Sequence, residues 1–140
     1  MQPRAILETV LYANDLEQAA WFFSQVLGLQ MPREMSELGI VFRVSSDQVL
    51  LVFDPTVSDQ PDRPVPSHGA RGPGHIALRI DHNDYDRWIR RFSEHGIPIE
   101  QEIEWTTHPS PGRSIYVRDP TGNSVELITA DIWAEHDQEP

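Results

Sequence analysis

The sequence of 140 residues contains no cysteine. This absence excludes disulfides, thiolate nucleophiles and zinc sites built on thiolates, so any bound metal must be held by His, Asp, Glu or water. The chain also lacks a run of about 18 apolar residues, the length that a membrane-spanning helix needs. Its first residues show no apolar signal core. We therefore expect a cytoplasmic protein with no membrane partner.

Basic residues are few. The chain has 11 of them against 22 acidic residues, which gives a formal net charge of -11. A surface this negative repels phosphate backbones, so a nucleic-acid partner is not expected, whereas a cationic ligand would be tolerated or attracted. Hydrophobic residues make up 39% of the sequence, which is typical of a globular chain with its own core.

The first half of the chain reads as a strand, a helix and three further strands. Residues 5–13 are rich in β-branched and aliphatic side chains, which predicts a strand. Asp15 and Gln18 have the spacing of a capping box, and apolar residues then recur at helical spacing up to Gly28, a typical helix stop. The strands expected after this helix span about 29–34, 39–45 and 48–53.

The second half repeats this order after a segment rich in proline. Residues 55–70 hold four of the 12 prolines and are predicted to be an extended linker. A strand at 74–80 and a helix from a cap at Asp84 to a stop at Gly96 follow. Residues 119–123 form a tight turn, with proline and glycine at the positions that a turn favours. The remaining expected strands lie near 98–105, 113–118 and 123–129.

This internal repeat predicts the fold class, α+β. A one-sided sheet cannot bury its own face, so we expect two βαβββ modules that pair into one open, curved mixed sheet around a pocket. The whole chain, 1–140, would then be a single domain. Its predicted parts are module one at about 5–54, the proline-rich linker at 55–70, module two at about 71–130 and an acidic tail at 131–140.

Three polar residues fall where strand alternation predicts the concave face of the sheet. Glu8, His75 and Glu126 each point away from an aliphatic strand face that would pack on a helix. Burying two carboxylates and an imidazole is costly unless they are paired, protonated or bound to a cation. A divalent metal ion (zinc, nickel, manganese or iron(II)) meets that need, and three ligands would leave positions open for water or substrate.

A second interpretation of the same residues needs no metal. A histidine on a strand is commonly a hydrogen-bonded core residue, and a strand glutamate is commonly salt-bridged. In that case Arg79, Arg113 and Arg118 would neutralise the carboxylates. Alternation alone leaves both interpretations open.

A polar and aromatic rim is predicted around the same pocket. Trp105 begins a loop with Thr106 and His108 that is expected to cover the site, and the strand near 113–118 contributes further polar groups. Such a rim suits an oxygen-rich small molecule. The predicted substrate-binding residues are Tyr116, Arg113, Arg79, Trp105 and Ser114.

Three segments resemble a known superfamily. They read LETVLYANDLEQAAWFFSQVLGL, GHIALRI and GRSIYVRDPTGNSVELIT. Over about residues 5–130 the chain resembles the vicinal oxygen chelate superfamily, which includes glyoxalase I, bleomycin-resistance proteins, fosfomycin-resistance enzymes and type I extradiol dioxygenases. The resemblance implies a homodimer.

The resemblance also implies metal ligands on the first and last strands of each module. These positions match Glu8, His75 and Glu126, and the remaining one falls at Leu50 or Leu51, neither of which binds a metal. The chain therefore differs from the four-ligand glyoxalase I pattern. It is closer to the three-ligand pattern of the fosfomycin enzymes and extradiol dioxygenases, although those have His where this chain has Glu8.

The function that the resemblance implies is a glyoxalase-like, metal-dependent enzyme. It would carry out lyase or isomerase chemistry on a small vicinal-oxygen substrate, with Glu126 or Glu8 doubling as general base. One alternative is a non-catalytic binding protein of the bleomycin-resistance kind, which would need no metal. Further alternatives are a fosfomycin-type transferase and an extradiol dioxygenase, although non-haem oxygen chemistry usually uses two His and one carboxylate.

Overall fold

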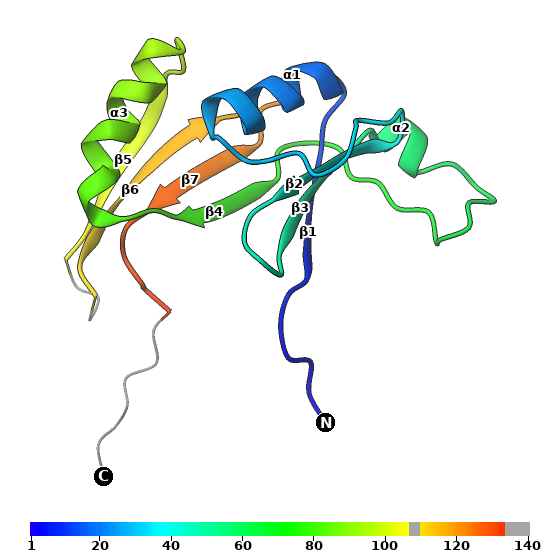
Figure 1. Ribbon diagram of the computed structural model, residues 1–140, viewed down its shortest axis with the longest axis horizontal. Helices are drawn as coiled ribbons and strands as arrows, with labels where there is room; N and C mark the ends of the chain where they lie inside the picture. The colour runs from blue at the N-terminus through cyan, green and yellow to red at the C-terminus, as the bar shows by residue number, and fades with distance from the viewer. Residues whose placement is uncertain (107–109, 134–140) are drawn as a thin grey trace. The chain divides into compact units, whose positions relative to one another are not determined.

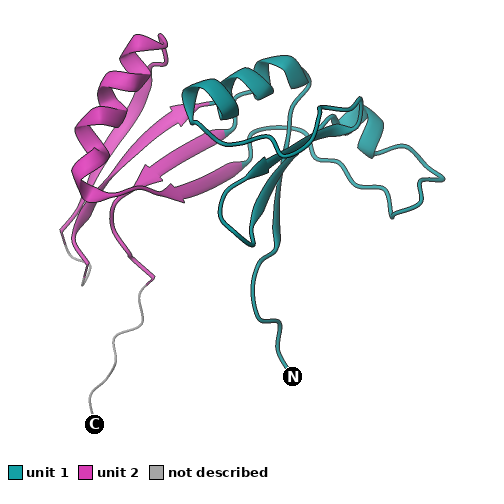
Figure 2. Ribbon diagram, in the orientation of Figure 1, with its two compact units in different colours: residues 1–74, 119–123 teal, residues 75–118, 124–140 magenta. Residues whose placement is uncertain are grey.

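The computed structural model of the protein describes residues 1–106 and 110–133, which form an α+β fold (Figure 1). The chain divides into two compact units (Figure 2). Unit 1 comprises residues 1–74 and 119–123, and unit 2 comprises residues 75–118 and the chain from residue 124 onward. The predicted fold class is confirmed, with one mixed sheet in each unit. The pairing of the two modules around one pocket stays a prediction.

Unit 1 contains a three-stranded sheet in the order β1-β3-β2. Its strands are β1 (Glu8–Tyr12), β2 (Gly39–Arg43) and β3 (Val49–Phe53). β1 runs parallel to β3, and β2 runs antiparallel to it. These three strands lie within the ranges that the sequence predicted.

The strand predicted at 29–34 is wrong. Only a single bridge, between Gln30 and Arg43, joins this segment to the sheet. Pro32 has no backbone N–H to donate, so a ladder cannot continue through it. Module one therefore has a single bridged residue, Gln30, at the point where module two has a full strand.

The helix of unit 1 begins as predicted. The Asp15 side chain accepts a 3.0 Å hydrogen bond from the Gln18 N–H and caps α1 (Leu16–Ala20). The helix continues as η1 (Trp21–Val26), a wider π-helical segment. There the Ser24 hydroxyl donates to the Ala20 carbonyl, which the Ser24 N–H would use in a regular α-helix. Gly28 ends the helix at a φ of +76°.

The predicted linker is not wholly extended. Residues 55–58 form α2 (Pro55–Ser58), a short helix that the sequence analysis did not predict. The Asp54 side chain caps it by accepting a 2.8 Å hydrogen bond from the Thr56 N–H. Proline at the first helical position is favourable because its missing N–H has no partner there in any helix. Residues 59–74 contain no further helix or strand.

Unit 2 contains a four-stranded sheet in the order β4-β7-β6-β5. Its strands are β4 (His75–Arg79), β5 (Ile99–Trp105), β6 (Gly112–Arg118) and β7 (Ser124–Ile128). β4 and β7 are parallel, and the other pairs are antiparallel. All four strands agree with the predicted ranges to within a residue or two.

The helix of unit 2 is preceded by a 3₁₀ turn, η2 (His82–Asp84), and spans α3 (Tyr85–Glu94). Asp84 is the N-cap residue of α3, as predicted, but its side chain makes no capping hydrogen bond, and its carboxylate pairs with Arg87 at 2.6 Å instead. Gly96 adopts a φ of +68° just after the helix, as predicted. Over residues 1–106 and 110–133, no helix has both the length and the apolar character that crossing a membrane requires.

The turn at 119–123 belongs to unit 1 although its sequence lies in the second half of the chain. The Asn123 side chain accepts a 2.7 Å hydrogen bond from the Gly74 N–H and donates one of 3.1 Å to the Tyr12 carbonyl. Asn123 is 2% exposed. A buried amide thus satisfies backbone groups from two other segments, which the sequence did not reveal.

Candidate functional site

A histidine and a glutamate meet on the sheet of unit 2. In the parallel β4–β7 ladder His75 lies opposite Ser124 and Ala77 lies opposite Glu126, so His75 and Glu126 are diagonal neighbours on one face. The His75 Nε2 and Glu126 Oε2 atoms are 3.5 Å apart. The imidazole is 52% exposed and the carboxylate only 7%. A nearly buried carboxylate therefore faces a half-exposed imidazole.

Polar groups on β5 and β6 hold the Glu126 carboxylate. The Ser114 hydroxyl donates to Glu126 Oε1 at 2.6 Å, and the Trp105 indole N–H donates to the Ser114 oxygen at 2.6 Å. Tyr116 lies directly opposite Glu126 in the β6–β7 ladder. Burial, together with the hydrogen bond to Glu126 and the negative charge of that residue, raises the pKa of Tyr116 to about 12. Tyr116 is thus a protonated hydrogen-bond donor at neutral pH.

The His75 ring is also held in place. Its Nδ1 lies 3.3 Å from the Ser124 hydroxyl, and its plane stacks on Tyr116 with 6.4 Å between centroids and 20° between planes. These contacts leave Nε2 as the nitrogen that faces Glu126. Ser124 was not among the residues predicted to take part in the site.

A cavity of about 400 Å³ adjoins this pair within unit 2. His75, Arg79 and Glu126 contribute polar groups to its wall. The rest of the lining is mostly apolar: Ala77, Ile128, Ala130, Ile132 and Trp133, with Asp131 beside them. Asp131 forms a 2.6 Å ion pair with Arg79, so the segment predicted as the start of an acidic tail closes one side of the cavity.

Glu8 lies in the other unit. It is exposed at the start of β1, opposite Val49 of β3. Within residues 1–106 and 110–133, no three His, Asp or Glu side chains gather as a ready-made metal-binding group. Glu8 as a third ligand therefore stays a prediction.

Two of the predicted arginines pair with groups other than Glu126. The Arg113 guanidinium lies 3.7 Å from the centre of the Tyr85 ring and 3.5 Å from an Asp86 carboxylate oxygen, on the helix-facing side. Arg118 pairs with Glu100 at 2.6 Å. The structure thus brings Trp105, Ser114 and Tyr116 to Glu126, and Arg79 to the cavity, but places Arg113 elsewhere. His108 lies outside the described residues.

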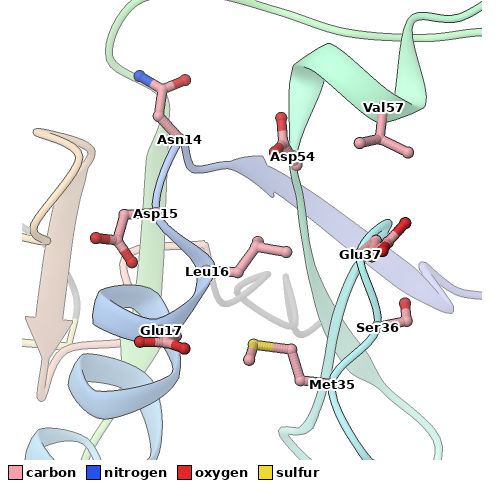
Figure 3. A pocket seen from close by; sticks show the side chains of 9 residues that line it. All are labelled: Asn14, Asp15, Leu16, Glu17, Met35, Ser36, Glu37, Asp54 and Val57. Carbon is pink, nitrogen blue, oxygen red and sulfur yellow. The ribbon is translucent and has the colours of Figure 1, made fainter.

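A second pocket, in unit 1, is lined by four carboxylates (Figure 3). It measures about 640 Å³, and its lining contains Asp15, Glu17, Glu37 and Asp54 together with the apolar residues Leu16, Met35 and Val57. Asp15 and Asp54 are already engaged, since each accepts a hydrogen bond from a backbone N–H at a helix start. These two carboxylates therefore have local structural roles.

Comparisons with known proteins agree with this fold. Residues 5–127 match the Glyoxalase/Bleomycin resistance protein/Dioxygenase superfamily, and the chain belongs to that superfamily. A crystal structure of lactoylglutathione lyase from Agrobacterium tumefaciens is 39% identical, with a TM-score of 0.85 over 95% of this chain and 98% of that one.

More distant structures share the fold alone. Fosfomycin resistance protein FosX from Mesorhizobium loti is 22% identical, with a TM-score of 0.63 over 94% of this chain and 96% of that one. The oxidase ChaP-H2 is 23% identical, with a TM-score of 0.65 over 95% and 98%. No protein with a curated function matches the chain significantly.

The donors at the unit 2 site suit a divalent metal ion. An imidazole nitrogen and a carboxylate oxygen are ligands of zinc, nickel, manganese and iron(II). His75 Nε2 and Glu126 Oε2 face each other at 3.5 Å, and the other oxygen and nitrogen of each group are already hydrogen-bonded. Outer hydrogen bonds of this kind commonly orient metal ligands. The residues present therefore fit the metal that the superfamily implies.

Proposed function

We propose that the protein is a glyoxalase-like, metal-dependent enzyme that performs lyase or isomerase chemistry on a small vicinal-oxygen substrate. The observation that carries this proposal is the His75–Glu126 pair, in which a nearly buried carboxylate and an imidazole converge on one cavity. Membership of the superfamily and the 39% identity to a lactoylglutathione lyase support it.

His75, Glu126 and Glu8 would hold the metal. When bound, a divalent metal supplies Lewis-acid stabilisation of negative charge on a substrate oxygen. The side chains of the protein would form the substrate cavity and supply the general base. The cavity beside His75 and Glu126 has mostly aliphatic and aromatic walls, which would exclude water from a bound substrate.

Glu126 is the better of the two predicted general bases. Its carboxylate is fixed by the Ser114 hydroxyl at 2.6 Å, so the oxygen nearest His75 has a defined position at the cavity wall. A base held in this way can take a proton from a substrate carbon or hydroxyl and return it at a second position, as isomerisation requires. Glu8 is exposed at a strand end and has no comparable support among the contacts described.

The alternative function is non-catalytic binding of a small cationic molecule, as in the bleomycin-resistance members. The net charge of -11 favours such a ligand. Extradiol dioxygenation has less support, because non-haem oxygen chemistry usually uses two His and one carboxylate, whereas the proposed ligands are one His and two Glu. Transferase chemistry on fosfomycin needs a cationic pocket, and Arg113 and Arg118 pair with carboxylates other than Glu126.

Metal titration of chelator-treated protein tests the proposal. Calorimetry with zinc, nickel, manganese and iron(II) is expected to show one ion per chain for the unsubstituted protein. Glu126→Gln and His75→Ala should each weaken binding by more than about 100-fold, beyond the loss caused by removing an outer-shell partner. Glu100→Gln and His82→Ala are matched controls at exposed positions and should bind normally.

Activity separates the enzyme from the binder. The metal-loaded protein should convert the hemithioacetal of glutathione and methylglyoxal, or a related vicinal-oxygen compound, and Glu126→Gln should not. Unchanged metal binding in both site variants would refute the metal assignment. Ligand binding that is indifferent to metal, with no turnover, would favour the binding protein.

Assembly as a homodimer and a cytoplasmic location belong to the same proposal. Light scattering is expected to give the mass of two chains. A monomer at micromolar concentration would contradict the first part.

A further inference from the structure

Three side chains on consecutive strands of unit 2 form a hydrogen-bonded chain. The Trp105 indole Nε1 lies 2.6 Å from Ser114 Oγ, and Ser114 Oγ lies 2.6 Å from Glu126 Oε1. Trp105 ends β5, Ser114 lies on β6 and Glu126 lies on β7. Adjacent strands of one sheet thus carry the series from Trp105 to the proposed metal ligand.

The direction of the two protons follows from the chemistry of the groups. An indole N–H only donates, so Ser114 must accept from Trp105. The single hydroxyl proton of Ser114 is then free to point to Glu126, whose carboxylate accepts it in a short, charge-assisted hydrogen bond. The indole therefore biases the serine hydroxyl toward the carboxylate.

Because Ser114 is buried, it can position Glu126 but cannot contact a substrate in the cavity. Ser114 has no exposed surface and Glu126 has 6%, whereas the cavity is lined by Glu126 and not by Ser114. A ligand in the cavity would touch the Glu126 oxygen that faces His75, while Ser114 holds the other oxygen from behind. Ser114, predicted from sequence to bind substrate, is better placed to orient the group that does.

We propose that Ser114 and Trp105 are positioning residues that fix the rotamer of Glu126. Through the same hydrogen bonds, a change at the Glu126 carboxylate alters the environment of the Trp105 indole N–H. Removal of the serine hydroxyl takes away one of the groups that hold Glu126 and leaves the indole N–H without this acceptor. The coupling requires only the three side chains, and the consequence for metal affinity rests on the function proposed above.

The indole signals in ¹H–¹⁵N spectra of metal-free protein at pH 7 give a readout that is independent of activity. The sequence has four tryptophans, and Trp105→Phe assigns the Trp105 resonance by its loss. Ser114→Ala should shift this resonance, because the substitution removes the hydroxyl that lies 2.6 Å from the indole Nε1. Glu126→Gln should move it as well, although the substituted residue is two hydrogen bonds away.

Ser58→Ala is a matched control. Ser58 is also a serine with no exposed surface, but it lies in unit 1, and its hydroxyl has no hydrogen-bond partner within the described residues. This control should leave the Trp105 resonance unmoved and the metal affinity unchanged. Ser114→Ala should weaken zinc binding about 10- to 100-fold, as expected for an outer-shell partner. Trp105→Phe should weaken it less, because the Ser114 hydroxyl remains.

Two results would overturn the proposal: a Trp105 resonance that Glu126→Gln leaves in place, or zinc affinity of Ser114→Ala equal to that of Ser58→Ala. If the unsubstituted protein binds no metal, the proposed function fails, while the resonance shift in metal-free protein still decides the positioning role. If zinc binding depends on Glu126 but not on Ser114, the function stands and the positioning role is refuted.

Discussion

The first and last strands of each module form a parallel pair in both units, yet the two pairs present different chemistry. In unit 2, β4 and β7 bring together His75 and Glu126, and Ser124 and Tyr116 surround them. In unit 1 the corresponding face of β1 and β3 is half-exposed, and beyond Glu8 it is apolar or aromatic: Val10, Tyr12, Val49, Leu51 and Phe53. The same backbone pattern therefore carries the His75–Glu126 network in unit 2, whereas in unit 1 it carries the exposed Glu8 and a hydrogen bond between Tyr12 and His68.

The strand registers show which residue stands where the second carboxylate would be. Glu126 lies opposite the residue two positions after His75, and Leu51 lies opposite the residue two positions after Glu8. The sequence alone left the choice between Leu50 and Leu51 open. Since Leu50 is fully buried on the helix-facing side, the difference between the units at this point is Leu51 against Glu126.

The largest effect on stability is expected from placing a carboxylate on the buried, helix-facing side of β3. Leu50→Glu should lower the free energy of unfolding by at least about 4 kcal/mol, because it removes a buried aliphatic group and buries a charge. Leu51→Glu should cost only about 1 kcal/mol, since water reaches that face. Urea unfolding followed by circular dichroism measures both. Equal losses would mean that the two faces of β3 are assigned wrongly.

An intermediate effect is expected on the titration of Tyr116. Its pKa of about 12 is raised first by burial and then by Glu126, so Glu126→Gln should lower it part of the way toward 10. Ultraviolet absorbance of tyrosinate measures this change, with Tyr116→Phe to identify the signal. Tyr85, which donates to Glu102 on the other face, is the internal control. If Glu126→Gln leaves the pKa of Tyr116 unchanged, the two groups do not interact and the site geometry is contradicted.

The same shift fixes the sign of a stability change. A tyrosine whose pKa is raised in the folded state contributes stability that is fully present below pH 10 and is lost as the pH rises toward about 12. The free energy of unfolding should therefore fall over this range, and it should fall less steeply in Glu126→Gln.

The smallest effect distinguishes the starts of the two helices. Asp15→Ala should destabilise the protein by about 1 kcal/mol, because the Asp15 carboxylate caps α1. Asp84→Ala should cost about 0.5 kcal/mol or less, because Asp84 only forms an exposed ion pair with Arg87. Thermal unfolding of both variants gives the comparison. If Asp84→Ala destabilises the protein as much as Asp15→Ala does, the two aspartates contribute equally to their helix starts and the distinction is refuted.

Strand alternation and helix punctuation were enough to predict most of the fold. Gly28 and Gly96 were read as helix stops, and both adopt the left-handed backbone conformation that favours glycine. Local rules failed where a single residue blocked the pattern, as at Pro32, or where a side chain had a competing partner, as Asp84 does in Arg87. The short helix at Pro55–Ser58 was hidden by the prolines around it.

The candidate site was predictable only in part. Alternation placed His75 and Glu126 on one face, because side chains two residues apart on a strand point the same way. The prediction that Arg113 binds substrate did not follow this rule: Arg113 and Ser114 are consecutive on β6 and point to opposite faces, Arg113 over Tyr85 and Ser114 to Glu126. The order of hydrogen bonds from Trp105 to Glu126 depends on which strands are neighbours and on their register.

The sequence by itself determined the repeat of strand and helix, the superfamily and the types of donor available, because these follow from periodicity, turn residues and composition. Only the tertiary structure decided that Glu126 is nearly buried and held by Ser114, that Arg79 pairs with Asp131, and that Asn123 joins Gly74 to Tyr12. The physical reason is that these contacts join residues far apart in the chain, whose distances are set by strand pairing and packing rather than by local spacing.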